Sequence, residues 1–202
     1  MKKRILYIHG LGGGEDSRIP GLLSSRLDGC GIEVKVCPYS FDPQDAAITL
    51  QNRMKEYSPD LVIAESLGAC HAMRIPGVKE IHVSPALGAE HIFARFANSA
   101  DCPVMGKIWK RLSRKREGRR QKVCTDRTTL LKYRNMGPYC REGGESYAFF
   151  GMRDFYRAFG IVSVRRWKKL FGCASFTLYN GSHWMEEEYI DSLLVPKILE
   201  MI

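Results

Sequence analysis

The chain has 202 residues, of which 45% are hydrophobic and 26% are charged. This composition excludes a disordered or fibrous protein, and the length suits one domain with a sizeable core. The formal net charge is +9, but nine Lys and Arg against one acid, Glu117, stand between Gly106 and Lys122. The rest of the chain is therefore close to neutral, and the high isoelectric point describes one segment.

Short apolar runs alternate with longer helical patterns along the chain. Most of the runs are almost continuously apolar, as expected for parallel strands that helices cover on both faces. Strands are predicted at Arg4–His9, Ile32–Tyr39, Leu61–Ala64, Glu80–Val83, Tyr147–Gly151 and Ser175–Tyr179, and helices at Ile19–Leu27, Pro43–Tyr57, Leu67–Arg74, Phe155–Leu170 and Tyr189–Met201. The alternation predicts a three-layer α/β/α sandwich around a mostly parallel sheet of six strands.

One interval, residues 88–144, contains no convincing strand. A structureless loop of that length inside a compact domain would be unusual. We therefore expect a single domain, 1–202, that carries a helical insertion over one edge of the sheet.

The cysteines and the N-terminus bear on the compartment. Seven cysteines stand at irregular spacings without a C-x-x-C pair, which argues against a disulfide framework or a structural zinc site and predicts free thiols. The apolar run after Met1–Arg4 is too short for a signal peptide, and no stretch is long enough to span a membrane. These features predict a cytoplasmic protein.

Ser66 follows a predicted strand and precedes a predicted helix, in the segment Ala64-Glu65-Ser66-Leu67-Gly68. This is the context of a G-x-S-x-G nucleophile elbow, in which small residues two before and two after permit a sharp turn. The turn would lift the hydroxyl clear of the sheet and direct N–H groups of the helix start at developing negative charge. The alternative is that Ser66 only caps the helix.

A second segment, His9-Gly10-Leu11-Gly12-Gly13-Gly14, follows the first predicted strand. It suits the first half of an oxyanion hole, with the N–H of Leu11 paired with that of Leu67. A dinucleotide fingerprint would need a glycine where Glu15 stands, and no Gly-Lys-Ser/Thr follows for a Walker loop. A plain turn is the remaining alternative.

Asp154 and His183 each follow a later strand. Asp154 stands three residues after Gly151, and His183 follows the last strand in a glycine-containing loop. The carboxyl ends of parallel strands are where catalytic groups gather. Taken alone, Asp154 could equally cap a helix, and a single histidine is usually structural. The chain order Ser66, Asp154, His183 is, however, the order of an α/β-hydrolase triad.

The chain resembles the α/β-hydrolase superfamily, and within it the small bacterial YqiA-like esterases. The resemblance is carried by Leu6–Gly12, Leu61–Ala69, Gly151–Asp154 and Asn180–His183. It implies the strand order 2-1-3-4-5-6, the triad Ser66, Asp154 and His183, and oxyanion donors at Leu11 and Leu67. Two departures are Ala64 in place of the usual glycine and the basic insertion.

The implied reaction is hydrolysis of a carboxylic ester or thioester through an acyl-enzyme, which needs no cofactor and no metal. Substrate contacts are expected at His9, Gly10, Tyr39 and Glu65. The competing hypothesis is a non-catalytic binding protein on the same fold, since fold does not fix function. Neither the acyl group nor the oligomeric state follows from the sequence.

The basic segment 106–122 also contains Trp109 and Leu112, so its plainest interpretation is one helix with a solvated charged face. Among sharper alternatives we favour a cap whose charge attracts an anionic substrate. A membrane surface is a further alternative. Nucleic acid is not expected, because no aromatic platform or known module is evident.

Overall fold

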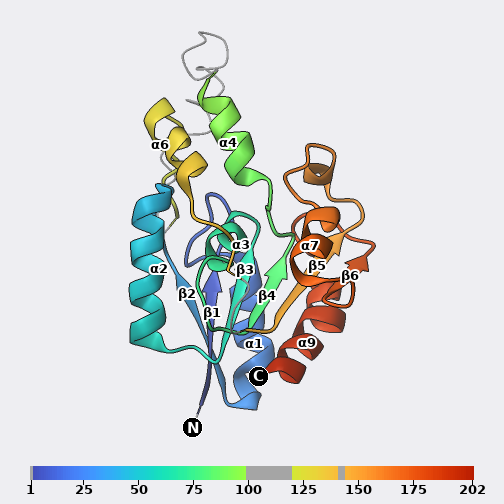
Figure 1. The fold of residues 1–202 in the computed structure, drawn as a ribbon. Coiled ribbons are helices and arrows are strands. Elements are labelled where there is room, and N and C mark those ends of the chain that lie inside the picture. The colour runs from blue at the N-terminus through green and yellow to red at the C-terminus, as the bar shows by residue number, and fades with distance from the viewer. Residues whose placement is uncertain (1, 99–119, 141–143) are drawn as a thin grey trace.

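Six parallel strands form one sheet in the computed structural model of this chain, which describes residues 2–98, 120–140 and 144–202 (Figure 1). The strands lie in the order β2-β1-β3-β4-β5-β6, and every neighbouring pair is parallel. The expected fold class and strand order are confirmed. The strands are β1 Lys3–Ile8, β2 Ile32–Cys37, β3 Leu61–Glu65, β4 Glu80–Val83, β5 Ser146–Gly151 and β6 Phe176–Tyr179.

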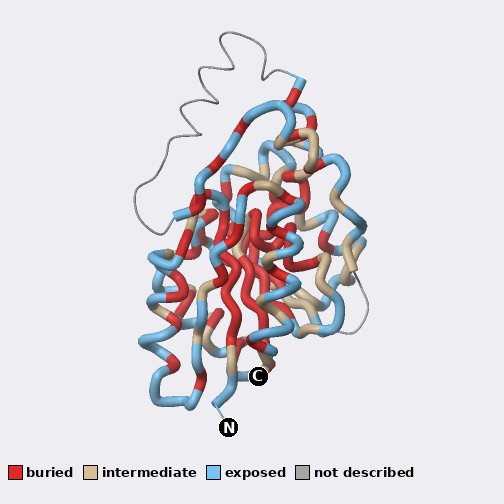
Figure 2. The backbone as a smooth tube through the Cα atoms, turned by 90° about the vertical axis from the view of Figure 1, so that its left-hand side faces the viewer, coloured by how far each residue is buried: buried red, intermediate tan, exposed pale blue. Residues whose placement is uncertain are grey.

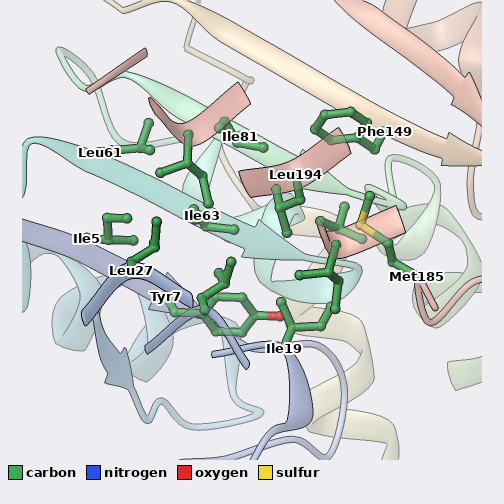
Figure 3. Packing of buried hydrophobic residues seen from close by; sticks show 14 of the residues in the cluster. Ile5, Tyr7, Ile19, Leu27, Leu61, Ile63, Ile81, Phe149, Met185 and Leu194 are labelled. Atoms are coloured by element: carbon green, nitrogen blue, oxygen red, sulfur yellow. The ribbon is translucent and has the colours of Figure 1, made fainter. Parts of the chain in front are cut away.

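Helices cover both faces of the sheet, and alternate residues of a strand enter different cores. Ile5 and Tyr7 of β1 pack with α1 (Arg18–Leu27) and with the C-terminal helical segment (Figure 3). Leu6 and Ile8 pack on the other face, against α2 (Pro43–Tyr57) and α3 (Leu67–Ala72). Burial on both faces explains why the central strands β1 and β3 are almost continuously apolar, and Figure 2 shows the buried centre of the molecule. The edge strands β2 and β6 are partly exposed.

The stretch predicted as one helix, Phe155–Leu170, is two shorter helices. A 3-10 turn, η3 (Phe155–Arg157), is followed by α7 (Val164–Phe171). Gly160 between them has φ of 68°, a left-handed conformation that glycine adopts without strain. The single-helix prediction was wrong because the apolar spacing continued across this break.

The C-terminal helical segment is longer than the predicted Tyr189–Met201. It comprises α8 (Glu187–Tyr189), a π-helical turn η4 (Ile190–Leu194) and α9 (Val195–Met201). A further 3-10 turn, η1 (Asp28–Cys30), ends α1. The helix predicted to end at Arg74 ends at Ala72.

The described part of the insertion is helical and lies beyond the carboxyl ends of the strands (Figure 1). It contains α4 (Ala89–Ala97), α6 (Arg127–Lys132) and the 3-10 turn η2 (Tyr133–Asn135). The ring of Phe93 packs on that of Tyr133 with 4.7 Å between centroids. Of the basic segment, only residues 120–122 are described, so the helix predicted there lies outside the described residues.

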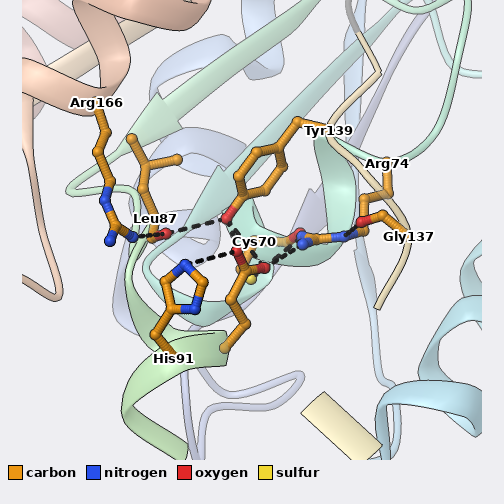
Figure 4. A network of polar contacts seen from close by, with 8 residues as sticks. Cys70, Arg74, Leu87, His91, Gly137, Tyr139 and Arg166 are labelled. Atoms are coloured by element: carbon orange, nitrogen blue, oxygen red, sulfur yellow. Dashed lines mark hydrogen bonds and ion pairs between the residues drawn. The ribbon is translucent and has the colours of Figure 1, made fainter. Parts of the chain in front are cut away.

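A partly buried polar network joins the insertion to Cys70 of α3 and to Arg74, which follows that helix (Figure 4). Arg74 is central to it: its Nε donates to the carbonyl of Gly137 at 2.6 Å, and its guanidinium pairs with Glu90. The hydroxyl of Tyr139 donates to the carbonyl of Leu87 at 3.1 Å. The insertion therefore rests on the helix that begins directly after Ser66.

Two general features concern the environment of the protein. The six described cysteines are free thiols. Within the described ranges, no helix is both long enough and apolar enough to cross a bilayer.

Candidate active site

Ser66 occupies a strained turn between β3 and α3. Its φ is 50° and its ψ is −113°, a conformation that costs a non-glycine residue about 1–3 kcal/mol and persists only where the surroundings enforce it. Two main-chain hydrogen bonds do so: the Ser66 N–H donates to Val83, and the Ser66 carbonyl accepts from Ala86, each at 3.0 Å. The side chain makes no cap hydrogen bond to α3, so the helix-cap alternative is not supported.

Gly68 permits the close approach of α3 to the end of β1. A Cβ at position 68 would stand 2.4 Å from the carbonyl oxygen of Ile8 and 2.5 Å from that of His9. The second small residue of the pentapeptide, Ala64, is fully buried between Ile8 and His82 in the sheet register. A methyl group fits there, which explains why alanine can replace glycine at the first position.

The structure brings Ser66, His183 and Asp154 together. The Nε2 of His183 lies 2.9 Å from the Ser66 hydroxyl oxygen, and its Nδ1 lies 2.8 Å from Oδ2 of Asp154. Asp154 and His183 are 4% and 6% exposed. The other carboxylate oxygen of Asp154 accepts from the N–H of Tyr156 at 2.8 Å. Asp154 therefore caps η3 and contacts His183 at once, so the two interpretations of this residue are compatible.

The loop that carries His183 is held from two sides. Arg18, at the start of α1, donates to the main-chain carbonyls of Trp184 and Met185, to the latter at 2.6 Å. The ring of Tyr156 lies against the His183 imidazole with 4.5 Å between centroids. These contacts restrict the imidazole to the orientation in which it reaches both partners.

The glycine turn after β1 lies next to the Ser66 turn. A Cβ on Gly10 would stand 3.2 Å from that of Ser66, and the N–H of Gly13 donates to the Gly10 carbonyl at 3.0 Å. Within the described part of the chain, no acceptor is recorded for the N–H of Leu11 or of Leu67. The role of these two N–H groups as oxyanion donors stays a prediction.

Gln121 was not found by sequence reasoning, and it fastens the glycine turn. Its side-chain oxygen accepts from the N–H of Gly12 at 3.0 Å, and its amide nitrogen donates to the carbonyl of Tyr39 at 3.2 Å. Its main-chain N–H donates to Gly13 at 2.7 Å. The part of the insertion around Gln121 therefore forms part of the wall of this site. No local motif signals this, because the contact spans more than a hundred residues.

Most of the four residues predicted to contact substrate form hydrogen bonds or ring contacts within the protein itself. Glu65 accepts a hydrogen bond from the Tyr7 hydroxyl at 2.8 Å, while the Tyr39 hydroxyl donates to the carbonyl of His9 at 2.8 Å. The rings of His9 and Tyr39 stack at 4.6 Å, and both residues are buried. These two also line, with Gln121 and Lys122, an open pocket of about 450 Å³. Their contact with substrate stays a prediction.

Behind Tyr39 lies His71, whose Nε2 is buried with no hydrogen-bond partner among the described residues. Burial, with the charge of Arg74, lowers the pKa of His71 to about 3. Because the unfolded chain binds a proton near pH 6.5 and the folded one does not, His71 favours folding above pH 6.5 and loses this contribution as the pH falls.

We expect the free energy of unfolding of the unmodified protein to fall, relative to His71→Phe, by about 1.4 kcal/mol per pH unit below 6.5. Urea denaturation of both proteins at pH 7.0, 6.0 and 5.0 measures the difference, and His9, whose pKa burial also lowers, is present in both. Parallel stability curves for the two proteins would contradict the prediction.

No group of three or more His, Cys, Asp or Glu side chains suited to a metal ion occurs among residues 2–98, 120–140 and 144–202. The histidines of these ranges instead lie against hydroxyl, carboxylate or aromatic groups. The described site thus brings a serine hydroxyl, an imidazole and a carboxylate into one hydrogen-bonded series.

The fold is shared with solved α/β-hydrolase structures. Est1E from Butyrivibrio proteoclasticus, solved with ferulic acid bound, superposes with a TM-score of 0.67 at 14% identity, covering 98% of this chain and 89% of that one. Mouse α/β hydrolase domain-containing protein 10 gives a TM-score of 0.65 at 14% identity, with 98% and 88% covered. A protein from Agrobacterium vitis gives a TM-score of 0.65 at 12% identity, with 100% of this chain and 88% of that one covered.

No protein-family model matches the sequence, and no curated protein does either. The structural similarities nevertheless show that this chain has the α/β-hydrolase fold. The narrower resemblance to YqiA-like esterases stays a prediction.

Proposed function

We propose that this protein is a serine hydrolase that cleaves carboxylic esters or thioesters through an acyl-enzyme. The observation that carries the proposal is the continuous hydrogen-bonded series from Ser66 through His183 to Asp154, at 2.9 and 2.8 Å. Such a series on strand-to-loop exits is the arrangement that activates a serine nucleophile. The esterases and hydrolases among proteins of this fold support the same class.

In the first half-reaction, the Ser66 oxygen attacks the carbonyl carbon while His183 Nε2 takes the hydroxyl proton. Asp154 stabilises the imidazolium, and the N–H groups of Leu11 and Leu67 bind the oxyanion. The tetrahedral intermediate collapses as His183 returns the proton to the leaving alcohol or thiol. A water molecule then attacks the acyl-enzyme by the same route, which releases the acid and restores the serine.

A fluorophosphonate probe tests the nucleophile directly. We expect the unmodified protein to be labelled on one peptide that contains Ser66, and Ser66→Ala to remain unlabelled. The matched control is Ser58→Gly, because Ser58 has a positive φ, 43°, as Ser66 does, and stands exposed at the C-terminal end of α2. It should label like the unmodified protein.

Labelling that persists in Ser66→Ala would exclude this nucleophile. No labelling of the unmodified, folded protein would favour the non-catalytic binding alternative instead.

A further inference from the structure

An aromatic shelf borders the His183 side of the candidate active site. In the described part of the chain, three Phe or Trp side chains are exposed: Phe155 (68%), Phe159 (55%) and Trp184 (62%). All three follow Asp154 or His183 closely in sequence. With the half-buried Tyr156 they form what we call the aromatic shelf.

The shelf is continuous and begins at the imidazole. Tyr156 and Trp184 lie 4.5 and 5.8 Å from the His183 ring, measured between centroids. Phe155 lies 5.9 Å from Tyr156 and 4.8 Å from Phe159. Apolar surface thus extends outward from the group that we propose as the general base.

Exposed aromatic rings are costly in water, and their concentration at one site indicates that something apolar covers them. Exposed aliphatic side chains occur elsewhere, such as Ile48 on α2 and Leu199 on α9, but singly. Isolated residues of that kind need no explanation. The shelf differs from them because its rings touch one another and the imidazole.

The position of the shelf relative to His183 identifies the part of the substrate that it meets. During acylation, His183 Nε2 gives its proton to the leaving oxygen, so that oxygen must lie within hydrogen-bonding reach of Nε2. The remainder of the leaving group extends from this point, where the rings that flank the imidazole offer it apolar surface.

Resting on the proposed function, we infer that the leaving alcohol of the substrate carries a large apolar group, alkyl or aryl, that packs on the aromatic shelf. The shelf then determines specificity for the alcohol half of the ester and not for the acyl half. Apolar contacts of this kind are worth about tenfold or more in specificity.

Two ester series test the inference. In the first, the acyl group is acetyl and the alcohol is ethyl or hexyl; in the second, the alcohol is ethyl and the acyl group is acetyl or hexanoyl. Primary alcohols leave with similar intrinsic reactivity, so the kcat/KM ratio within the first series reports contacts of the alcohol. A pH-stat measures both series.

We expect Phe159→Ala and Trp184→Ala each to lower the hexyl-to-ethyl ratio by about tenfold, and Phe159→Leu to restore most of it. The hexanoyl-to-acetyl ratio should not change. Ile48→Ala, which removes an equally exposed apolar side chain remote from the triad, should alter neither ratio. Thermal unfolding confirms that each variant is folded.

Three outcomes would overturn the inference. In the shelf variants, the hexanoyl-to-acetyl ratio could fall while the hexyl-to-ethyl ratio stays constant, or neither ratio could change. The shelf variants could also lose sedimentation with phosphatidylcholine vesicles while both ratios stay constant, which would make the shelf a lipid contact. If the unmodified protein neither labels at Ser66 nor hydrolyses any ester, the proposed function fails as well; labelling with unchanged ratios refutes the shelf alone.

Discussion

Ser66→Ala is expected to lower kcat for ester hydrolysis by about 10⁶-fold, because every later step depends on the acyl-enzyme that the hydroxyl forms. His183→Ala should have a comparable effect, since its Nε2, the base that we propose, lies 2.9 Å from the hydroxyl. The double variant should lose little more than either single one, because the two side chains act as one unit.

Asp154→Asn should cost about 10⁴-fold. The amide can still accept from the N–H of Tyr156, as the carboxylate does at 2.8 Å, but it cannot stabilise the imidazolium. Single-turnover kinetics with a chromogenic ester, together with circular dichroism, separate this loss from unfolding. Additive losses in the Ser66/His183 double variant, or an active Ser66→Ala, would contradict the assignment.

Gly68→Ala is expected to lower the free energy of unfolding by about 3 kcal/mol or more. The added methyl group would stand 2.4 and 2.5 Å from two main-chain carbonyl oxygens, those of Ile8 and His9. Neither can move away easily, because β1 is the buried second strand of the sheet. Any relief must shift α3, and with it Ser66, so labelling by the fluorophosphonate should slow as well.

Gly21→Ala is the matched control. Gly21 lies inside α1, and nothing stands within 4 Å of a Cβ there. Alanine should therefore stabilise the protein by about 0.5–1 kcal/mol. Urea denaturation measures both variants. A Gly68→Ala protein within about 1 kcal/mol of the unmodified one would show that the contact of α3 with β1 is looser than the structure indicates.

Most strands could be predicted because burial on both faces leaves short, mostly apolar runs in the sequence. Glu80–Val83 was predicted with its observed bounds, and the other strands to within one or two residues. The candidate triad could be found for a related reason. Ser66, Asp154 and His183 each follow a strand, and the carboxyl ends of parallel strands share one edge of the sheet.

Features that depend on contacts distant in sequence could not be predicted. Gln121 gives no local signal, since its partners Gly12 and Tyr39 are set by the path of the insertion. The break at Gly160 was missed because a glycine inside an apolar repeat can equally be tolerated within a helix. The aromatic shelf was missed because exposure cannot be read from residue type.

The hydrogen bonds of Gln121 to the glycine turn mean that the insertion cannot be treated as a separable module. An insertion between two strands is a natural target for deletion, or for exchange with a related protein. Here residue 121 supplies the acceptor for Gly12 and a donor to Gly13, and Arg120 pairs with Gly14 in an antiparallel bridge. A graft that kept the sheet and discarded the insertion would leave the turn beside Ser66 without these supports, so cap and turn must be transplanted as one piece.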